Sequence, residues 1–231
     1  MTMKGFIAGS RSAIPTVIGY LSIGLACGIV GAKAGITPVE MFLMSVLVYA
    51  GSGQFAISAT ILTHEPVVSI VMTVFLINLR HFLMSLHVST VFPQANLGEQ
   101  VLIGSFLTDE SYGVLLGEHV HNKEIKPSWM YGNNFTSYSA WIAGTTLGAL
   151  LGSLIPNPDR FGIDFALIAM FLAIFMTQLE GLRRTVRWRK IGIILITVSL
   201  VFLSSAYLLS SSLAVLCATL CGCLIGVMID D

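Results

Sequence analysis

Long apolar runs separated by short polar breaks dominate this chain of 231 residues. A helix needs about 17 to 25 apolar residues to cross roughly 30 Å of hydrocarbon, and the runs have that length. Only 10% of the residues are charged and the mean hydropathy is +0.85, whereas a soluble domain has about 25% charged residues. The runs lack the alternation of apolar and polar residues that a membrane β-barrel requires. The chain is therefore predicted to be an all-α integral membrane protein, a polytopic helical bundle.

Run length and hydropathy predict seven or eight transmembrane helices in a single transmembrane domain of residues 1–231. The connection Ser210–Ser212 before the last apolar run is very short, so the seven-helix alternative stays open. The eight candidate spans are residues 13–35, 38–62, 67–91, 101–117, 134–155, 162–180, 191–209 and 212–229.

Basic residues indicate how the chain is oriented in the membrane. Five of the twelve Lys and Arg lie in Arg183–Lys190, and Lys4 and Arg11 precede the first span. Cytoplasmic loops carry the excess of basic residues, so eight spans would place both termini in the cytoplasm. The formal net charge of zero gives no indication of a nucleic-acid partner.

The chain resembles itself at an offset of 124 residues, which pairs Gly24 with Gly148 and Gln54 with Gln178. The pairing continues through three successive spans and motivates the hypothesis of an internal duplication, with halves 1–124 and 125–231. Four spans in each half would make the two copies parallel, whereas an odd number would make them inverted. Both alternatives stay open, and Gln178 becomes a candidate site residue as the counterpart of Gln54.

The second span contains the string Tyr49-Ala50-Gly51-Ser52-Gly53-Gln54. Two glycines near the middle of a span let the helix unwind, and such glycine-broken helices expose backbone N–H groups to substrates. The N–H groups that begin the second half-helix favour an anion such as a carboxylate. Ser52 and Gln54 would add side-chain donors. Close helix packing at the two glycines, without unwinding, is the alternative.

Glycines also recur at helical spacing in the first and fifth spans. Gly24 and Gly28 lie four residues apart, as do Gly144, Gly148 and Gly152. Small residues at this spacing let a second backbone approach closely in lipid. Close helix packing is therefore the predicted role of these glycines.

The third span carries the string Asn78-Leu79-Arg80-His81. A guanidinium this near the middle of a span must find a carboxylate, carbonyl groups or water, and its planar fork suits a carboxylate. Asn78 and His81 are three residues apart and share a helix face. If the span is shifted along the chain, Arg80 would instead extend to the lipid headgroups.

The fourth span contains Thr108, Asp109 and Glu110, followed by Ser111 and Tyr112. These two adjacent acids are candidates for pairing with Arg80, for holding a substrate ammonium or for carrying a coupling proton, because burial disfavours a charged carboxylate. Asp109 and Tyr112 fall on one helix face. A purely structural ion pair with Arg80 is the alternative.

Other classes of function receive less support from the sequence. No nucleophile accompanied by a base and an orienting group, no His-Glu-x-x-His zinc motif and no phosphate loop occurs, so we expect neither an enzyme nor a bound metal or cofactor. An ion channel or metal transporter that uses Asp109, Glu110 and His81 as ligands remains the alternative function.

Several of these strings occur together in a characteristic order, and they resemble the AzlC family, the large permease subunit of branched-chain amino-acid exporters. The resemblance covers most of the chain. It implies a bacterial cytoplasmic-membrane exporter of leucine, isoleucine, valine and sometimes methionine that works with a small AzlD-like membrane subunit. We expect this export to be secondary transport coupled to protons. The strings are Gly19-Tyr20, Tyr49–Phe55, Asn78–His81, Phe106–Glu110 and Gly162–Ala166.

Taken together, the motifs and the resemblance lead to a hypothesis of alternating access around a cavity between the second, third and fourth spans. Arg80 and the glycine break would take the substrate carboxylate, Asp109 would take its ammonium or a proton, and apolar side chains would surround its aliphatic part. The expected substrate-binding residues are Tyr49, Gly51, Ser52, Gly53, Gln54, Asn78, Arg80, His81, Thr108, Asp109, Glu110, Tyr112 and Gln178.

Overall fold

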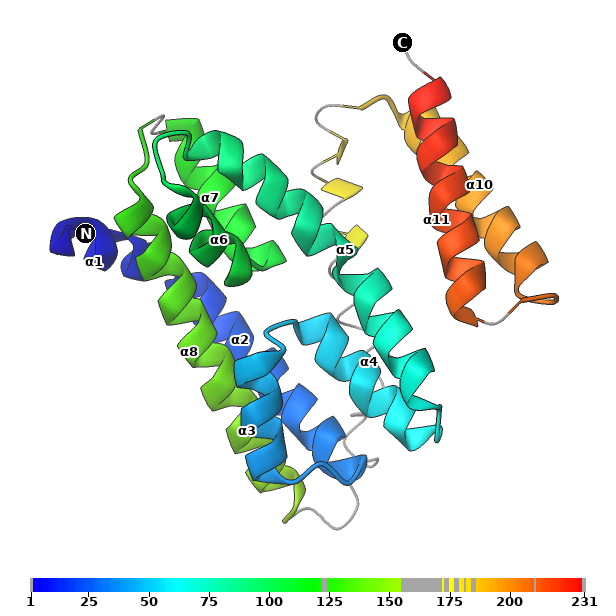
Figure 1. Cartoon of the computed structure of the whole chain (residues 1–231), viewed down its shortest axis with the longest axis horizontal. Helices are drawn as coiled ribbons and strands as arrows, with labels where there is room; N and C mark the ends of the chain where they lie inside the picture. The colour runs from blue at the N-terminus through cyan, green and yellow to red at the C-terminus, as the bar shows by residue number, and fades with distance from the viewer. Residues whose placement is uncertain are drawn as a thin grey trace.

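The computed structural model describes residues 2–121, 124–154, 186–209 and 211–229, with a few single positions between 172 and 183. All regular structure within these ranges is α-helical, which confirms the predicted class of all-α membrane protein (Figure 1). Helices α2, α5 and α10 are each long and apolar enough to cross a membrane. The helices are α1 (Met3–Ser12), α2 (Ile14–Lys33), α3 (Pro38–Leu47), α4 (Gly51–Leu62), α5 (Val67–Val91), α6 (Leu97–Ser105), α7 (Asp109–His121), α8 (Pro127–Gly152), α10 (Trp188–Ser205) and α11 (Ser211–Met228).

Glycines hold α8 against α1 and α2 along its whole length. A Cβ added to Gly28 would overlap the backbone of Thr145 and Gly148, and one added to Gly9 would overlap the backbone of Trp129. The role predicted for the glycines at helical spacing is therefore confirmed, because these backbones approach too closely for any larger residue. Residue numbers rise together along the contact, so α1, α2 and α8 run in the same direction (Figure 1).

The direction of α8 bears on the hypothesis of internal duplication. The offset of 124 residues pairs α2 with α8, and parallel copies require these two helices to point the same way, as they do. The counterpart Gln178 lies outside the described residues. The duplication itself therefore stays a prediction.

Helices α3 and α4 form a re-entrant pair and are not one continuous span. A capping box between Thr37 and Glu40 begins α3, and the helix ends at Leu47. The chain then leaves the helical conformation until α4 begins at Gly51. The chain leaves the C-terminal end of α2 along α3 and returns toward it along α4 (Figure 1). A Cβ on Gly31 in this part of α2 would meet the side chain of Met41 in α3 and lie near that of Ser58 in α4. The prediction that this helix is broken is confirmed, but the break lies at residues 48–50 and the predicted unwinding at Gly51–Gln54 is wrong, because these residues form the first turn of α4. The predicted crossing by residues 38–62 is also wrong.

Helices α6 and α7 form a second re-entrant pair, which the sequence analysis missed. A capping box between Asn96 and Glu99 begins α6, and the helix ends at Ser105, four residues before α7 begins. Along α5, both helices lie on the C-terminal side of Arg80: Gly104 of α6 approaches Ser85, and Tyr112 of α7 bonds His87. The predicted continuous span 101–117 is therefore wrong, because the chain turns back at residues 106–108.

The two re-entrant pairs belong to two similar units of opposite orientation. Each unit is one crossing helix followed by a re-entrant pair, namely α2 with α3–α4 and α5 with α6–α7. The C-terminal half of α5 packs against the start of α8, in a cluster that contains Val88, Phe92 and Trp129. Because α2 runs parallel to α8, α5 runs opposite to α2 (Figure 1). The units are therefore inverted with respect to each other, an arrangement that many transporters share.

Helix length places both breaks near the middle of the membrane. Helices α3 and α6 have 10 and 9 residues, which gives each a length of about 15 Å at 1.5 Å per residue. This is half of the roughly 30 Å of hydrocarbon. Non-helical backbone at such depth is stable only where protein or a water-filled cavity surrounds it.

Replacing Gly28 with alanine is expected to push α2 away from α8, because the new Cβ would overlap the Thr145 carbonyl oxygen. Overpacking of this kind costs about 1–3 kcal/mol, so we expect a lower melting temperature and less monodisperse protein in detergent. Gly19→Ala on the same helix is the matched control, since nothing lies within 4 Å of its added Cβ. Equal melting temperatures for the two variants would contradict the close packing of α2 and α8.

Candidate functional site

The two re-entrant breaks meet beside one small cavity, which the long helices α2, α5 and α8 complete. Helix α2 supplies Tyr20 and Ile23, α5 supplies Arg80 and His81, and α8 supplies Trp141. The remaining lining residues come from the two breaks and the helix starts that follow them. They are Tyr49, Gly51, Ser52, Thr108, Asp109 and Glu110.

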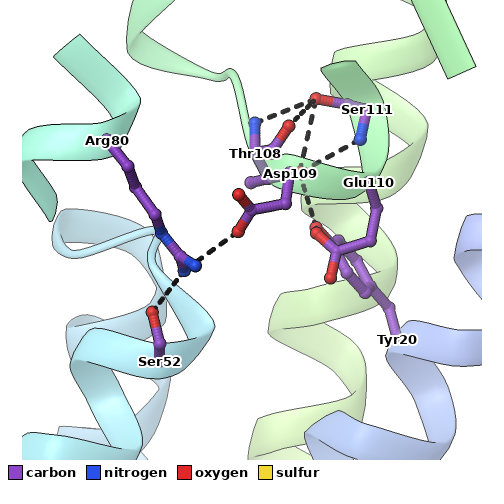
Figure 2. Close-up of polar contacts among 7 residues, drawn as sticks. All are labelled: Tyr20, Ser52, Arg80, Thr108, Asp109, Glu110 and Ser111. Carbon is purple, nitrogen blue, oxygen red and sulfur yellow. Dashed lines mark hydrogen bonds and ion pairs between the residues drawn. The ribbon is translucent and has the colours of Figure 1, made fainter. Parts of the chain in front are cut away.

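Arg80 joins the two re-entrant pairs. Its Nη2 donates to Ser52 Oγ at 2.6 Å in the first turn of α4 and lies 2.9 Å from Asp109 Oδ2 at the start of α7 (Figure 2). The side chains of Arg80 and Asp109 are only 25% and 20% exposed. The predicted pairing of Arg80 with an acid is confirmed, and the alternative in which Arg80 extends to the headgroups is wrong.

Thr108 and Ser111 cap the start of α7. The Thr108 backbone N–H donates to Ser111 Oγ at 2.9 Å, and the Ser111 N–H donates to Thr108 Oγ1 at 3.3 Å. Side-chain oxygens that bond the free N–H groups of a first turn stabilise the helix start. This cap holds the two acids of the first turn, Asp109 and Glu110, at the cavity.

Tyr20 is the principal site residue that the sequence analysis did not select. Its hydroxyl lies 2.6 Å from Thr108 Oγ1 and donates to Glu110 Oε2 at 2.6 Å, and its side chain is nearly buried (Figure 2). The signal was available, because Gly19-Tyr20 belongs to the strings that carry the family resemblance. In addition, a tyrosine near the middle of an apolar span needs a partner for its hydroxyl.

Bonds that cross between the two inverted units hold both re-entrant pairs. Tyr20 on α2 of the first unit bonds the start of α7 in the second unit. Arg80 on α5 of the second unit bonds Ser52 at the start of α4 in the first unit. Each crossing helix therefore positions the re-entrant helix of the other unit.

Gln54 does not line the cavity and lies fully buried beside it. Its Oε1 accepts from Trp141 Nε1 at 2.8 Å, and its Nε2 donates to Ser45 Oγ at 3.0 Å. Ser45 in turn bonds Thr145 Oγ1 at 2.7 Å. The amide of Gln54 is therefore occupied on both sides, and its role is to hold α3, α4 and α8 together.

The remaining predicted residues lie at different distances from the cavity. Gly53 packs against Asn78, whose Nδ2 would lie 3.3 Å from a Cβ at this glycine. Tyr112 bonds His87 Nδ1 at 3.0 Å and does not line the cavity. Gln178 lies outside the described residues.

The cavity is narrow and has aromatic walls. Its volume of about 20 Å³ holds roughly one water molecule. The Tyr20 ring centroid lies 5.1 Å from that of Trp141 and 6.4 Å from that of Tyr49. Among the described residues, Arg80 Nε and Tyr49 Oη are buried without a hydrogen-bond partner. Polar atoms of this kind are available to a ligand once the cavity widens.

Metal binding was one of the alternatives for the two acids and the histidine. Within residues 2–121, 124–154, 186–209 and 211–229, no group of three or more His, Cys, Asp or Glu residues is arranged to hold a metal ion.

Comparisons with known proteins show relatives across most of the chain. The family model described as AzlC protein matches residues 15–155, a range that includes every residue of the cavity. The "Inner membrane protein YgaZ" of Escherichia coli (strain K12) is 29% identical over 222 residues, which cover 95% of this chain and 88% of that protein.

Two further relatives align with about three quarters of this chain's length. An "Uncharacterized membrane protein" of Archaeoglobus fulgidus is 32% identical over 178 residues, covering 76% of this chain and 77% of that protein. The "Branched-chain amino acid transport protein AzlC" of Bacillus subtilis (strain 168) is 28% identical over 177 residues, covering 74% of this chain and 68% of that protein. No solved structure matches this chain.

Arg80→Ala is expected to lower the melting temperature in detergent, because it leaves the mostly buried Asp109 carboxylate without its cation. Residues in direct contact interact by about 0.5–3 kcal/mol in double-mutant cycles. The double variant Arg80→Ala/Asp109→Ala should therefore be more stable than the sum of the two single effects predicts. Strictly additive effects would contradict an ion pair that stabilises the fold.

Gln54→Leu should also lower the melting temperature, since it leaves the Trp141 N–H without an acceptor inside the bundle. A buried polar group that loses its partner costs about 1–3 kcal/mol. Gln94→Leu, at an exposed position between α5 and α6, is the control for the same change of side chain. Equal stability of the Gln54 and Gln94 variants would show that the buried amide is not a structural link.

Proposed function

Because this chain belongs to the AzlC family, we propose that it is the large permease subunit of a branched-chain amino-acid exporter. The printed name of the Bacillus subtilis relative supports the substrate class. The ordered strings from Gly19 to Ala166 support the export function by family resemblance. The protein is a transporter and not an enzyme under this proposal.

The observation that carries the proposal is the meeting of Arg80, Asp109 and Glu110 at two re-entrant helix starts. An amino-acid zwitterion can leave water only if both of its charges are met, since an unpaired buried ion costs several kcal/mol. The start of α4 and Arg80 offer donors for the carboxylate, and helix N-termini favour anions. The two acids offer acceptors for the ammonium.

The small volume of the cavity sets the kind of transport cycle. About 20 Å³ is far below the size of a leucine side chain, so substrate binding requires the two re-entrant pairs to separate. Their breaks, at residues 48–50 and 106–108, are the natural hinges because no helical hydrogen bonds run through them. We propose alternating access in which one pair opens while the other stays closed.

Side-chain recognition in this site should be weak among aliphatic substrates. Ile23, Tyr49 and Trp141 provide apolar walls, and burial of an aliphatic side chain contributes about 1.5–3 kcal/mol. One methylene changes binding by roughly 1–3 kcal/mol. Leucine, isoleucine, valine and methionine are therefore all proposed substrates.

The setting of the transporter follows from the family and the charge pattern. We propose a bacterial cytoplasmic membrane location, a small AzlD-like membrane subunit as partner, and coupling of export to inward proton movement through the cavity carboxylates. Lys4 and Arg11 lie in the first and last turns of α1, and Lys126 precedes α8 beside it. Since basic residues mark the cytoplasmic side, the N-terminus is proposed to lie in the cytoplasm.

Cells that express this chain with its small subunit should export valine or leucine after loading with the corresponding dipeptide. Arg80→Ala and Asp109→Asn should reduce that export at least about tenfold, since a hydrogen bond to a charged group contributes about 1.5–3 kcal/mol. Glu65→Gln, at an exposed position between α4 and α5, should leave export unchanged. Normal export by the Arg80 variant at normal membrane abundance would remove Arg80 from the mechanism.

A further inference from the structure

The two adjacent acids of the cavity have different partners. Asp109 pairs with Arg80 at 2.9 Å, and Arg80 is the only Lys or Arg among the described residues that line the cavity. Glu110 accepts from the neutral hydroxyl of Tyr20 at 2.6 Å. The protein therefore supplies a cation to one carboxylate and leaves the other without one among the described cavity residues.

Tyr20 also fixes where the Glu110 carboxylate lies. It is buried on α2, and α2 is held against α8 by the close contacts of Gly24 and Gly28. A hydroxyl on such a constrained helix orients the carboxylate toward the cavity (Figure 2). Glu110 is therefore a positioned anion that a mobile cation can reach when the cavity opens.

The opposite side of the cavity offers donors. Ser52 lies in the first turn of α4, and Arg80 Nε is buried without a hydrogen-bond partner among the described residues. These groups suit a carboxylate, because guanidinium groups and helix starts both bind one well. The cavity thus has a side that donates hydrogen bonds and a side with one carboxylate that has no Lys or Arg partner among the described residues.

We propose that Glu110, positioned by Tyr20, binds the ammonium group of the transported amino acid, while Asp109 serves to hold Arg80. The assignment rests on the proposed function and differs from the sequence-based expectation that Asp109 takes the ammonium. It orients the substrate with its carboxylate toward α4 and its ammonium toward α7. It also makes a free α-ammonium the feature that the site selects.

The selection for an ammonium has a direct chemical probe. L-2-Hydroxyisovalerate has the carbon skeleton and carboxylate of L-valine, with a hydroxyl in place of the ammonium. A site built around a charged partner rejects an analogue that lacks the complementary group, because its buried polar atoms are then left unpaired. The wild-type protein should therefore prefer valine strongly over this hydroxy acid.

The test measures how well two competitors inhibit valine transport, in the export direction, across membrane vesicles that contain the chain and its small subunit. Radiolabelled valine is the substrate, and unlabelled valine and 2-hydroxyisovalerate are the competitors. Glu110→Gln should reduce the preference for valine by about 10–100-fold, since the amide keeps the acceptor for Tyr20 but loses the charge. Asp109→Asn should lower the flux and leave the preference nearly unchanged. Glu65→Gln, at an exposed position between α4 and α5, should alter neither.

Each outcome decides between the two acids. A preference within about twofold of wild type in Glu110→Gln, or a collapse of the preference in Asp109→Asn, would overturn the assignment while leaving branched-chain amino-acid transport intact. Absence of valine flux in wild-type vesicles would instead overturn the proposed function itself. Tyr20→Phe tests whether Tyr20 positions the Glu110 carboxylate. This variant should weaken the preference for valine over 2-hydroxyisovalerate less than Glu110→Gln does, because the carboxylate remains but is no longer oriented.

Discussion

Backbone groups that leave the helical conformation inside a membrane must be met by protein, because hydrocarbon offers no hydrogen-bond partners. This constraint explains why the two breaks of this chain lie together. The break before α4 and the break before α7 enter from opposite ends of the bundle and meet between α2, α5 and α8. The same meeting that protects the backbone brings two helix starts, with their partial positive charge, to one place.

The close-packed interface between α2 and α8 supports the place where the two breaks meet. The glycine contacts between α2 and α8 fix one wall of the bundle, and the buried amide of Gln54 joins α3 and α4 to that wall through Trp141 and Ser45. The polar bonds of Tyr20 and Arg80 then cross from one inverted unit to the other. Tightly packed helices and a closed polar network suit a scaffold, whereas the few side-chain bonds at the breaks can exchange with a substrate during a transport cycle.

The charges of the site match the chemistry of a zwitterion. Arg80 and Asp109 compensate each other, and Arg80 also donates to Ser52, so its guanidinium links the starts of α4 and α7. An arriving carboxylate can share the guanidinium, because its fork has several N–H groups in one plane. An arriving ammonium needs an acceptor that is not already committed to a cation. Binding of substrate and opening of the cavity would thus involve the same few bonds.

The sequence by itself determined the membrane class, the ends of α2 and α5 to within a few residues, and the roles of the packing glycines. These features follow from the length of apolar runs and from residue size, which act locally. It also indicated the break near Gly51 and most of the charged residues of the cavity, because glycines, arginine and acids are costly in hydrocarbon wherever they point.

Only the tertiary structure decided that residues 38–62 and 101–117 turn back and do not cross. A half-length helix that returns and a full helix that crosses have the same apolar composition, so hydropathy cannot separate them. Tertiary packing also decided three contacts of the site. Gln54 bonds Trp141, the Tyr20 hydroxyl bonds Glu110, and Arg80 forms its ion pair with Asp109. Which of the two neighbouring carboxylates pairs with arginine depends on distances between different helices. The order of residues along the chain does not contain these distances.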